Sequence, residues 1–366
     1  MSADRLPRDL HPVAWWAWAL GLALAASFTT NPLILLMLVG VAATVVSLRR
    51  SDQPWGRSFR LYVWLGVAIV GVRLVFWVVF GGWTGGRVLL DLPAVPLPHW
   101  AAGVTLLGPL YAEALLFALY DGLRLATIVI CVGAANSVAN PKRLLRSVPP
   151  ALYEIGTALV VAVTVLPQFA ESARRVRAAQ ALRAGETGRV RRLRRFLVPV
   201  LEDALERSLA LAAGMDTRGY GRASGATRAQ RRTTGALMLV GLGGICVGTY
   251  AVLDTTAPRV LALPMLGLGV AAAAAGLLSA GRRVERSRYR PDPWRWPEVA
   301  VVGSGVAVGV LGWWVNAHQP AVAYPALDAV PPVSGAALLL AVLGLLGPLC
   351  SPPPRLVAGS MQEAVA

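Results

Sequence analysis

The chain has 366 residues, of which 56% are hydrophobic and only 15% charged, and its mean hydropathy is +0.58. This composition excludes an ordinary soluble domain and predicts a polytopic membrane protein. The net charge of +16 comes almost entirely from arginine, since Lys142 in "NSVANPKRL" is the single lysine. Because a P-loop requires the lysine of G-x-x-x-x-G-K-[ST], the chain does not bind ATP by that motif.

Apolar runs long enough for a membrane span of about 20 residues follow one another along the chain. They fall near residues 13–28, 32–48, 61–81, 121–138, 151–168, 234–254, 259–279, 297–317 and 333–350. We expect these runs to be helices, because lipid cannot satisfy a free backbone amide and the runs do not alternate as the strands of a barrel would.

Arginine clusters predict the orientation of these spans. The basic residues within 5–8, 49–60 and 282–290 flank apolar runs and should lie in the cytoplasm. The segments "FTTNP", "LDTTAP" and "AHQPAVAYPALDAVPP" carry no arginine or lysine and should lie outside. The basic segment "NPKRLLR" is separated from the next cluster by the single run 151–168, so either that run is oblique or re-entrant, or the rule fails once here.

The largest basic cluster spans residues 171–232, with fifteen arginines against six acidic residues. Within it, "QFAESARRVRAAQALRAG" and "LEDALERSLALAAGMDTRG" carry apolar residues three or four apart, which predicts two amphipathic helices of about four to five turns. Each helix should end in an arginine, Arg183 or Arg218, shortly before a glycine that suits a left-handed cap. The predicted fold class is therefore an all-α polytopic membrane protein, a helical transmembrane bundle with a cytoplasmic insertion of amphipathic helices.

The change from continuous apolar runs to an amphipathic period divides the chain into three predicted segments. Residues 1–170 form an N-terminal transmembrane block, residues 171–232 form the cytoplasmic region with the two arginine-tipped helices, and residues 233–366 form a C-terminal transmembrane block.

The stretches "LPQFAESARRVRAAQALRAG" and "LERSLALAAGMDTRGYG" resemble the transmembrane T component of energy-coupling factor (ECF) transporters, the family that includes the cobalt-transport permease often called CbiQ. In that family an apolar helix ends at a proline and a glutamate follows it, here Pro167 and Glu171. A long helix then ends in an X-Arg-X triplet, and a basic link leads to a second helix with another triplet before a glycine. "GPLYAEALLFALYDGLRLATIVI" and "NPKRLLRSVP" are also similar to the family, and the resemblance covers roughly residues 15–255.

The resemblance implies the scaffold subunit of an ABC-type importer in the bacterial plasma membrane. Two coupling helices would dock into two ABC ATPase subunits, and the membrane part would hold a substrate-binding S component for uptake of a vitamin or a transition-metal ion such as cobalt. The coupling residues carried over are Leu182, Arg183, Ala184, Thr217, Arg218 and Gly219, while Pro167 and Glu171 would shape the first coupling helix. After the second triplet the chain has room for four spans, where the family usually has about one.

Charged residues inside the apolar runs are further candidates, because an intramembrane charge is costly and normally faces protein or water. They are Arg73 in "VGVRLVFWVVF" and Glu113, Asp121 and Arg124 in "YAEALLFALYDGLRLA". We expect Arg73 to pair with Glu113 or Asp121 and to stiffen a surface that contacts the S component. The alternative is a structural ion pair or an arginine that reaches to the interface.

The sequence predicts no catalytic residue, no cofactor and no metal site. The three histidines and three cysteines are scattered, and the chain has no G-x-S-x-G or H-E-x-x-H motif. A membrane-embedded lipid-modifying enzyme is therefore the weaker alternative function. A second alternative is a polybasic protein that binds anionic lipid; nucleic acid is disfavoured, because few aromatic residues accompany the arginines of 171–232.

Overall fold

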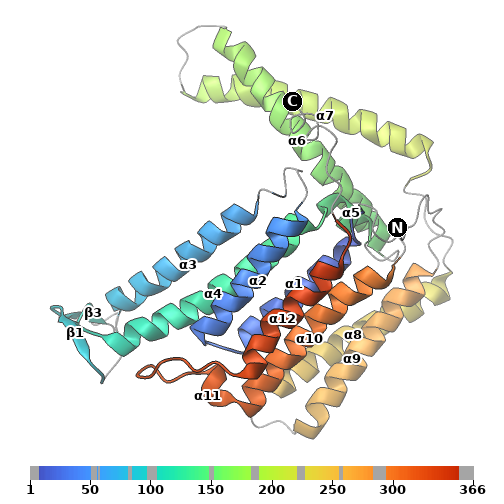
Figure 1. Cartoon of the computed structure of the whole chain (residues 1–366). Helices are drawn as coiled ribbons and strands as arrows, with labels where there is room; N and C mark the ends of the chain where they lie inside the picture. Colours follow the sequence, from blue (N-terminus) through green and yellow to red (C-terminus); the bar gives the residue numbers. More distant parts are fainter. Residues whose placement is uncertain are drawn as a thin grey trace, which may run out of the picture. The chain divides into compact units, whose positions relative to one another are not determined.

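The computed structural model describes residues 8–50, 56, 58–80, 85–96, 105–147, 152–182, 189–220, 227–254, 259–282 and 294–353 (Figure 1). Helices occupy most of these residues, and each of the nine predicted apolar runs lies in a helix, so the fold class is confirmed. The chain forms two compact units, one made of residues 1–144 with 291–366 and the other of residues 145–290. The division into three segments at 170 and 232 stays a prediction.

The elements follow the apolar runs with small shifts at their ends. The helices are α1 (Pro12–Ser27), α2 (Pro32–Arg49), α3 (Phe59–Phe80), α4 (Ala112–Val138), α5 (Pro141–Arg146), α6 (Tyr153–Leu182), α7 (Arg189–Thr217), α8 (Arg228–Leu253), α9 (Arg259–Gly281), α10 (Trp296–His318), α11 (Pro320–Ala323) and α12 (Gly335–Cys350). The strands, which were not predicted, are β1 (Val88–Asp91), β2 (Val95–Pro96), β3 (Thr105–Leu106) and β4 (Pro109–Tyr111). They form two antiparallel pairs, β1 with β4 and β2 with β3, between α3 and α4.

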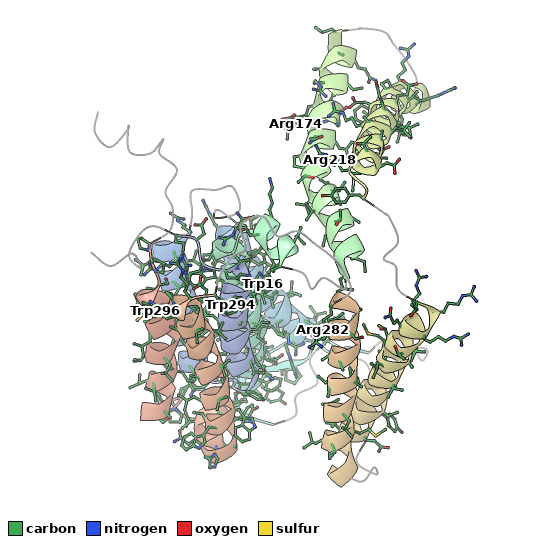
Figure 2. The ribbon with its side chains drawn as sticks, turned by 90° about the vertical axis from the view of Figure 1, so that its right-hand side faces the viewer. Trp16, Arg174, Arg218, Arg282, Trp294 and Trp296 are labelled. Atoms are coloured by element: carbon green, nitrogen blue, oxygen red, sulfur yellow. The ribbon has the colours of Figure 1, made fainter. Side chains whose placement is uncertain are left out.

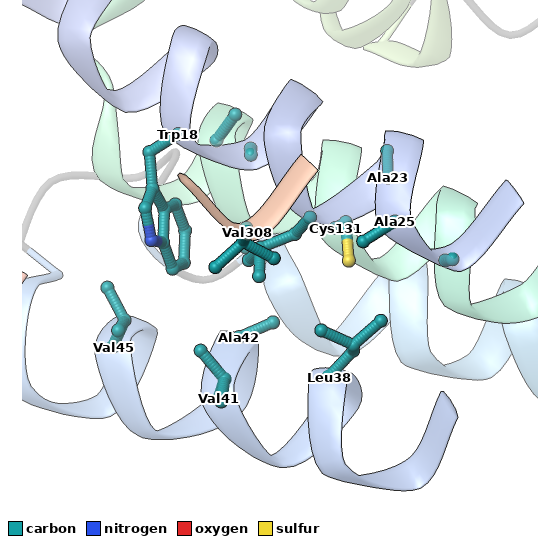
Figure 3. Close-up of a cluster of buried hydrophobic side chains, with 14 of the residues drawn as sticks. Trp18, Ala23, Ala25, Leu38, Val41, Ala42, Val45, Cys131 and Val308 are labelled. Atoms are coloured by element: carbon teal, nitrogen blue, oxygen red, sulfur yellow. The ribbon is translucent and has the colours of Figure 1, made fainter. Parts of the chain in front are cut away.

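In the first unit, α1 lies among α4, α10 and α2, and α12 packs against α10 and α2 (Figure 1). The buried core gathers where these helices meet, with Trp18 of α1, Leu38 of α2, Cys131 of α4 and Val308 of α10 drawn together in Figure 3. The last two long helices of the chain therefore complete the core that the first helices begin.

The close packing of α1 on α10 depends on glycine. A Cβ placed on Gly21 of α1 would come within 2.0 Å of the carbonyl oxygen of Gly305, and a Cβ on Gly305 would come within 2.4 Å of the Cα of Trp18. Side chains larger than hydrogen would push the two backbones apart, which is why small residues are common where membrane helices cross.

A second contact of α1 is a hydrogen bond to a backbone carbonyl of α12, which a proline in that helix leaves free. Pro348 has no N–H for the carbonyl of Gly344, four residues earlier in the helix. The indole Nε1 of the buried Trp18 donates a hydrogen bond of 2.9 Å to that carbonyl oxygen. The group that the proline leaves without a helical partner is thereby satisfied by another helix.

Basic and acidic side chains meet at one end of this unit. Arg8 donates to both carboxylate oxygens of Glu298, at 2.6 and 2.8 Å, and joins the chain before α1 to the start of α10. Arg143 donates to the carbonyl of Asp9 at 3.1 Å, so the basic segment "NPKRLLR" lies at the same end as Arg8.

The opposite end of the unit joins two of the loops that lack basic residues. The side-chain amide of Asn31 donates to the carbonyls of Val322 and Pro332, both at 2.8 Å, and the hydroxyl of Thr29 donates to Ala323 at 2.8 Å. "FTTNP" and the loop after α10 therefore lie at one end together, as the charge pattern predicts for the pair.

Seven of the described helices are long and apolar enough to cross a membrane, by length and composition, and α1 and α12 are shorter apolar helices. In α10 the aromatic residues lie near both ends, with Trp296 at its start and Trp313 and Trp314 near its end. Eighteen residues of helix separate Trp296 from Trp314 and cover about 27 Å. That length is close to the hydrocarbon thickness between the two interfaces where tryptophan is enriched.

In the second unit, α8 and α9 form a tightly packed pair. A Cβ on Gly241 or Gly248 of α8 would come within 3.0 Å of the backbone of α9, at Ala273 and Leu266. The remaining long helices of this unit, α6 and α7, end at Leu182 and Thr217, the first residue of each predicted coupling triplet.

Candidate coupling helices

The helix α6 runs without a break from Tyr153 to Leu182 and contains Pro167. The expectation that an apolar helix ends at Pro167 is therefore wrong. Proline removes the hydrogen bond to Val163, four residues earlier, but the φ of its ring is compatible with a helix, and such helices continue where neighbouring groups satisfy the backbone. In the preceding turn the hydroxyl of Thr164 also bonds backbone carbonyls, those of Val160 and Val161, at 3.0 and 2.9 Å.

The helix α7 begins at Arg189, about three turns before the predicted stripe at Leu201. The arginine-rich stretch 189–195 is thus part of the helix, and Pro199 lies inside it. Pro199 leaves the carbonyl of Arg195 without its helical donor, and the side-chain amide of Gln180 in α6 donates to that carbonyl instead. The neighbouring helix therefore allows α7 to continue through the proline.

Further contacts show that α6 and α7 lie side by side and antiparallel. The guanidinium of Arg177 lies 5.6 Å from the ring centroid of Phe196, one residue from the Gln180 contact with Arg195. Farther from the end of α6, the buried Ser172 lies beside the carboxylate of Asp203 in α7. Residue numbers increase along α6 while those of the contacting residues decrease along α7. The two antiparallel helices therefore contact each other at three positions along their length.

Asp203 connects the two helices electrostatically. Its Oδ1 accepts from Nε of Arg207 at 3.1 Å within α7. The hydrogen bond from Ser172, followed by that from Arg207 and the nearby charge of Arg175, lowers the pKa of the Asp203 carboxyl. An ionised Asp203 thus bonds Arg207 of its own helix and lies near Ser172 and Arg175 of α6.

The C-terminus of α7 has the cap that the sequence predicts. Gly219 has a φ of +76°, in the left-handed region. The N–H of Tyr220 donates to Met215 at 3.1 Å, and the N–H of Gly219 donates to Asp216 at 2.9 Å, which are the two bonds of a Schellman motif. Arg218 is therefore the last residue before the chain turns away, and its exposed side chain stands at the tip of the helix (Figure 2).

The first tip is described only up to Leu182, the last residue of α6, whose side chain is 88% exposed. Arg183 and Ala184 lie outside the described residues. Glu171 lies in α6 and is exposed, as is Thr217 at the end of α7. The coupling roles of all these residues stay predictions.

The charged residues in the membrane spans are partnered. Arg73 of α3 forms an ion pair with Asp121 of α4, which is one of the two pairings expected. Glu113 does not contribute to it; its carboxylate accepts from the backbone N–H of Arg87 at 2.9 and 3.1 Å. Arg124 donates to the carbonyl of Ser27, at the C-terminus of α1, where the helix dipole favours a cation.

A comparison with models of known protein families identifies the family of the chain. The family model of CbiQ, described as cobalt transport protein, matches residues 3–228. The chain belongs to this family. The match includes α1 to α7 with both predicted coupling tips and ends at the start of α8, so the four later spans lie beyond it. A search of curated proteins finds no match to the chain.

Membership of the CbiQ family shows a membrane transport component rather than an enzyme. Among the residues described, no group of three histidine, cysteine, aspartate or glutamate side chains is placed to hold a metal ion. The sequence interpretation missed two contacts, Asp203 with Ser172 and Arg8 with Glu298. Glu298 could have been suspected, since an acidic residue inside an apolar run is costly without a partner.

Proposed function

We propose that the chain is the T component of an ECF-type ABC importer, which couples ATP hydrolysis by two partner ATPases to a membrane S component. The observation that carries this proposal is the tip of α7. Arg218 stands exposed at a helix end fixed by a glycine cap, and no ion pair within the described ranges includes it. A planar guanidinium held in this way suits bidentate binding of a carboxylate in a groove of another protein.

The α6–α7 pair supports a mechanical role. Contacts at Ser172, Arg177 and Gln180 of α6 join it to α7, so a force on one tip is transmitted to both helices. When ATP closes the two ATPases, the tips carrying Arg183 and Arg218 are drawn together. The membrane helices then tilt and change the contact with the S component.

The membrane surface offered to the S component is the exposed face of α3. Only one residue of this helix, Gly66, is buried, whereas Trp64 and Val72 are largely exposed. The ion pair of Arg73 with Asp121 fixes α3 on α4 beside this face. The cargo is the vitamin or transition-metal ion, such as cobalt, that the S component binds.

The charge distribution supports the orientation. Arg8, Arg143 and Arg295 lie at one end of the first unit, together with Glu298 and Asp9. By the positive-inside rule this end faces the cytoplasm of a bacterial cell, and the end with Asn31 and Thr29 faces outward.

Co-purification with the ATPases tests the proposal. The tagged full chain is expressed with the ABC ATPases of its source organism, and the retained ATPase is identified and quantified by mass spectrometry. Arg218→Glu should lose the ATPase, because the reversed charge repels an acidic groove. Arg174→Glu is the matched control, since Arg174 (labelled in Figure 2) is an exposed arginine within α6 and not at the end of either helix. Equal retention of the ATPase by Arg218→Glu, Arg183→Glu and the control would reject the assignment.

A further inference from the structure

A row of exposed leucines runs along α7. Leu193, Leu197, Leu201, Leu205 and Leu209 are spaced four residues apart and are 57%, 42%, 62%, 61% and 62% exposed. Residues four apart are displaced by only about 40° around a helix, so the five side chains form one continuous ridge. Because the five side chains are exposed, the ridge is not covered by the described part of the chain. The helix α7 is also not among the helices that are apolar enough to span a membrane.

The same helix begins with a cluster of positively charged residues. Five of the seven residues from 189 to 195 are arginines, and none of the seven is acidic. Arginine is unfavourable at the positive N-terminal end of a helix dipole, and like charges one turn apart repel. Arg194 and Arg195 are exposed, and no ion pair within the described part of the chain includes either of them.

The leucine row and the arginine-rich first turns of α7 together favour an anionic membrane surface as the partner. We infer that α7 lies in the headgroup layer of the membrane, with its leucine row inserted between acyl chains and its first turns bound to anionic phospholipid headgroups. An amphipathic helix with leucine on one face and arginine beside it binds an anionic bilayer surface through both. The anionic headgroups supply the negative charge that the arginine-rich first turns lack. This inference does not depend on the ATPase contact, which concerns the other end of α7.

Site-directed spin labelling of the full chain tests the inference. The label is placed at position 201 or 205 in a variant with Cys131→Ala, Cys246→Ala and Cys350→Ala, and the protein is reconstituted in nanodiscs. Collision is measured with oxygen, which partitions into lipid, and with Ni-EDDA, which stays in water. The matched control is a label at Ala210, about 160° around the helix from the midpoint between Leu201 and Leu205.

In nanodiscs that contain phosphatidylglycerol, labels at 201 and 205 should favour oxygen, and the label at 210 should favour Ni-EDDA. The oxygen preference at 201 and 205 should fall in pure phosphatidylcholine. It should also fall in phosphatidylglycerol when Arg194→Gln and Arg195→Gln are introduced, by about fivefold per charge removed.

Three results would overturn the inference. One is equal Ni-EDDA collision at 201, 205 and 210, which would place the leucine row in water. Another is shielding of 201 and 205 from both reagents, which would show that protein covers the row. The third is an equal oxygen preference at 201 and 205 in the two lipid compositions, which would show that the anionic headgroups do not contribute to binding.

Discussion

The indole of Trp18 in α1 donates a hydrogen bond to the carbonyl of Gly344 in α12, which Pro348 has left without its own helical donor. The two residues are 326 positions apart in the chain. The same arrangement recurs in the second unit, where Gln180 of α6 donates to the carbonyl of Arg195 that Pro199 leaves free. Pro348 and Pro199 thus each free a backbone carbonyl that a side chain of a neighbouring helix uses as an acceptor.

Trp18→Phe should destabilise the first unit, because the buried carbonyl of Gly344 is left unsatisfied at a cost of about 1–3 kcal/mol. Pro348→Ala supplies a backbone N–H to that carbonyl. The cost of Trp18→Phe should therefore be smaller in a Pro348→Ala background, as measured by thermal unfolding of the purified protein in detergent. Equal costs in both backgrounds would show that the hydrogen bond does not matter.

Arg8→Ala should cost more stability than Glu298→Gln. The side chain of Glu298 is 1% exposed, whereas that of Arg8 is 23% exposed and can reach solvent when its partner is lost. Removing Arg8 leaves a buried carboxylate unpaired, for which about 3–5 kcal/mol is typical. Asp9→Ala is the control, because the looser pair of Asp9 with Arg143, at 3.9 Å, is worth about 0–1 kcal/mol. The reverse order of the first two variants would contradict the asymmetry of burial.

Reversing both charges of the Arg73–Asp121 pair should restore the membrane expression and the transport that either single reversal reduces. Arg73→Asp or Asp121→Arg alone places two like charges together between α3 and α4, and both expression in the membrane and transport should fall. The double variant Arg73→Asp with Asp121→Arg again pairs opposite charges. Glu113→Gln should not behave in this way, because Glu113 accepts from the backbone of Arg87. Failure of the double variant to recover would count against a role for the pair itself.

The α6–α7 crossing should weaken in acid. Because the pKa of Asp203 is lowered in the folded chain, its contribution is present above the unfolded value of about 3.9 and is lost as the pH falls through the folded pKa. Distances between spin labels at Ala178 and Ala210 should be unchanged from pH 7 to pH 5 and should broaden below about pH 4. Asp203→Asn should already be broad at pH 7 and insensitive to acid. A narrow distribution for Asp203→Asn would exclude this role.

The positions of the helices could be predicted, because each span is a long apolar run with few charged residues. The run 32–48 corresponds to α2, Pro32–Arg49, and the run 297–317 corresponds to α10, Trp296–His318. Their neighbours could not be predicted, since runs that are apolar on every side do not indicate which face meets another helix. The packing of α10 on α1 depends instead on Gly21 and Gly305, two glycines among 37 in the chain.

The candidate site was predictable in its local features only. The cap at Gly219 follows from neighbouring residues, so the tip at Arg218 could be read from the sequence. The continuation of α6 through Pro167 and of α7 through Pro199 could not. For Pro199 the reason is visible, since the compensating donor Gln180 is distant in sequence.

Photo-crosslinking from the tip of α7 tests the central claim most directly. A photoreactive amino acid at Thr217, next to Arg218, is introduced into the full chain in membranes that contain the partner ATPases. We expect a crosslink from position 217 to an ABC ATPase subunit and none from position 64, on the membrane face of α3. The absence of an ATPase adduct at position 217 would contradict the claim that Arg218 docks into a nucleotide-driven partner.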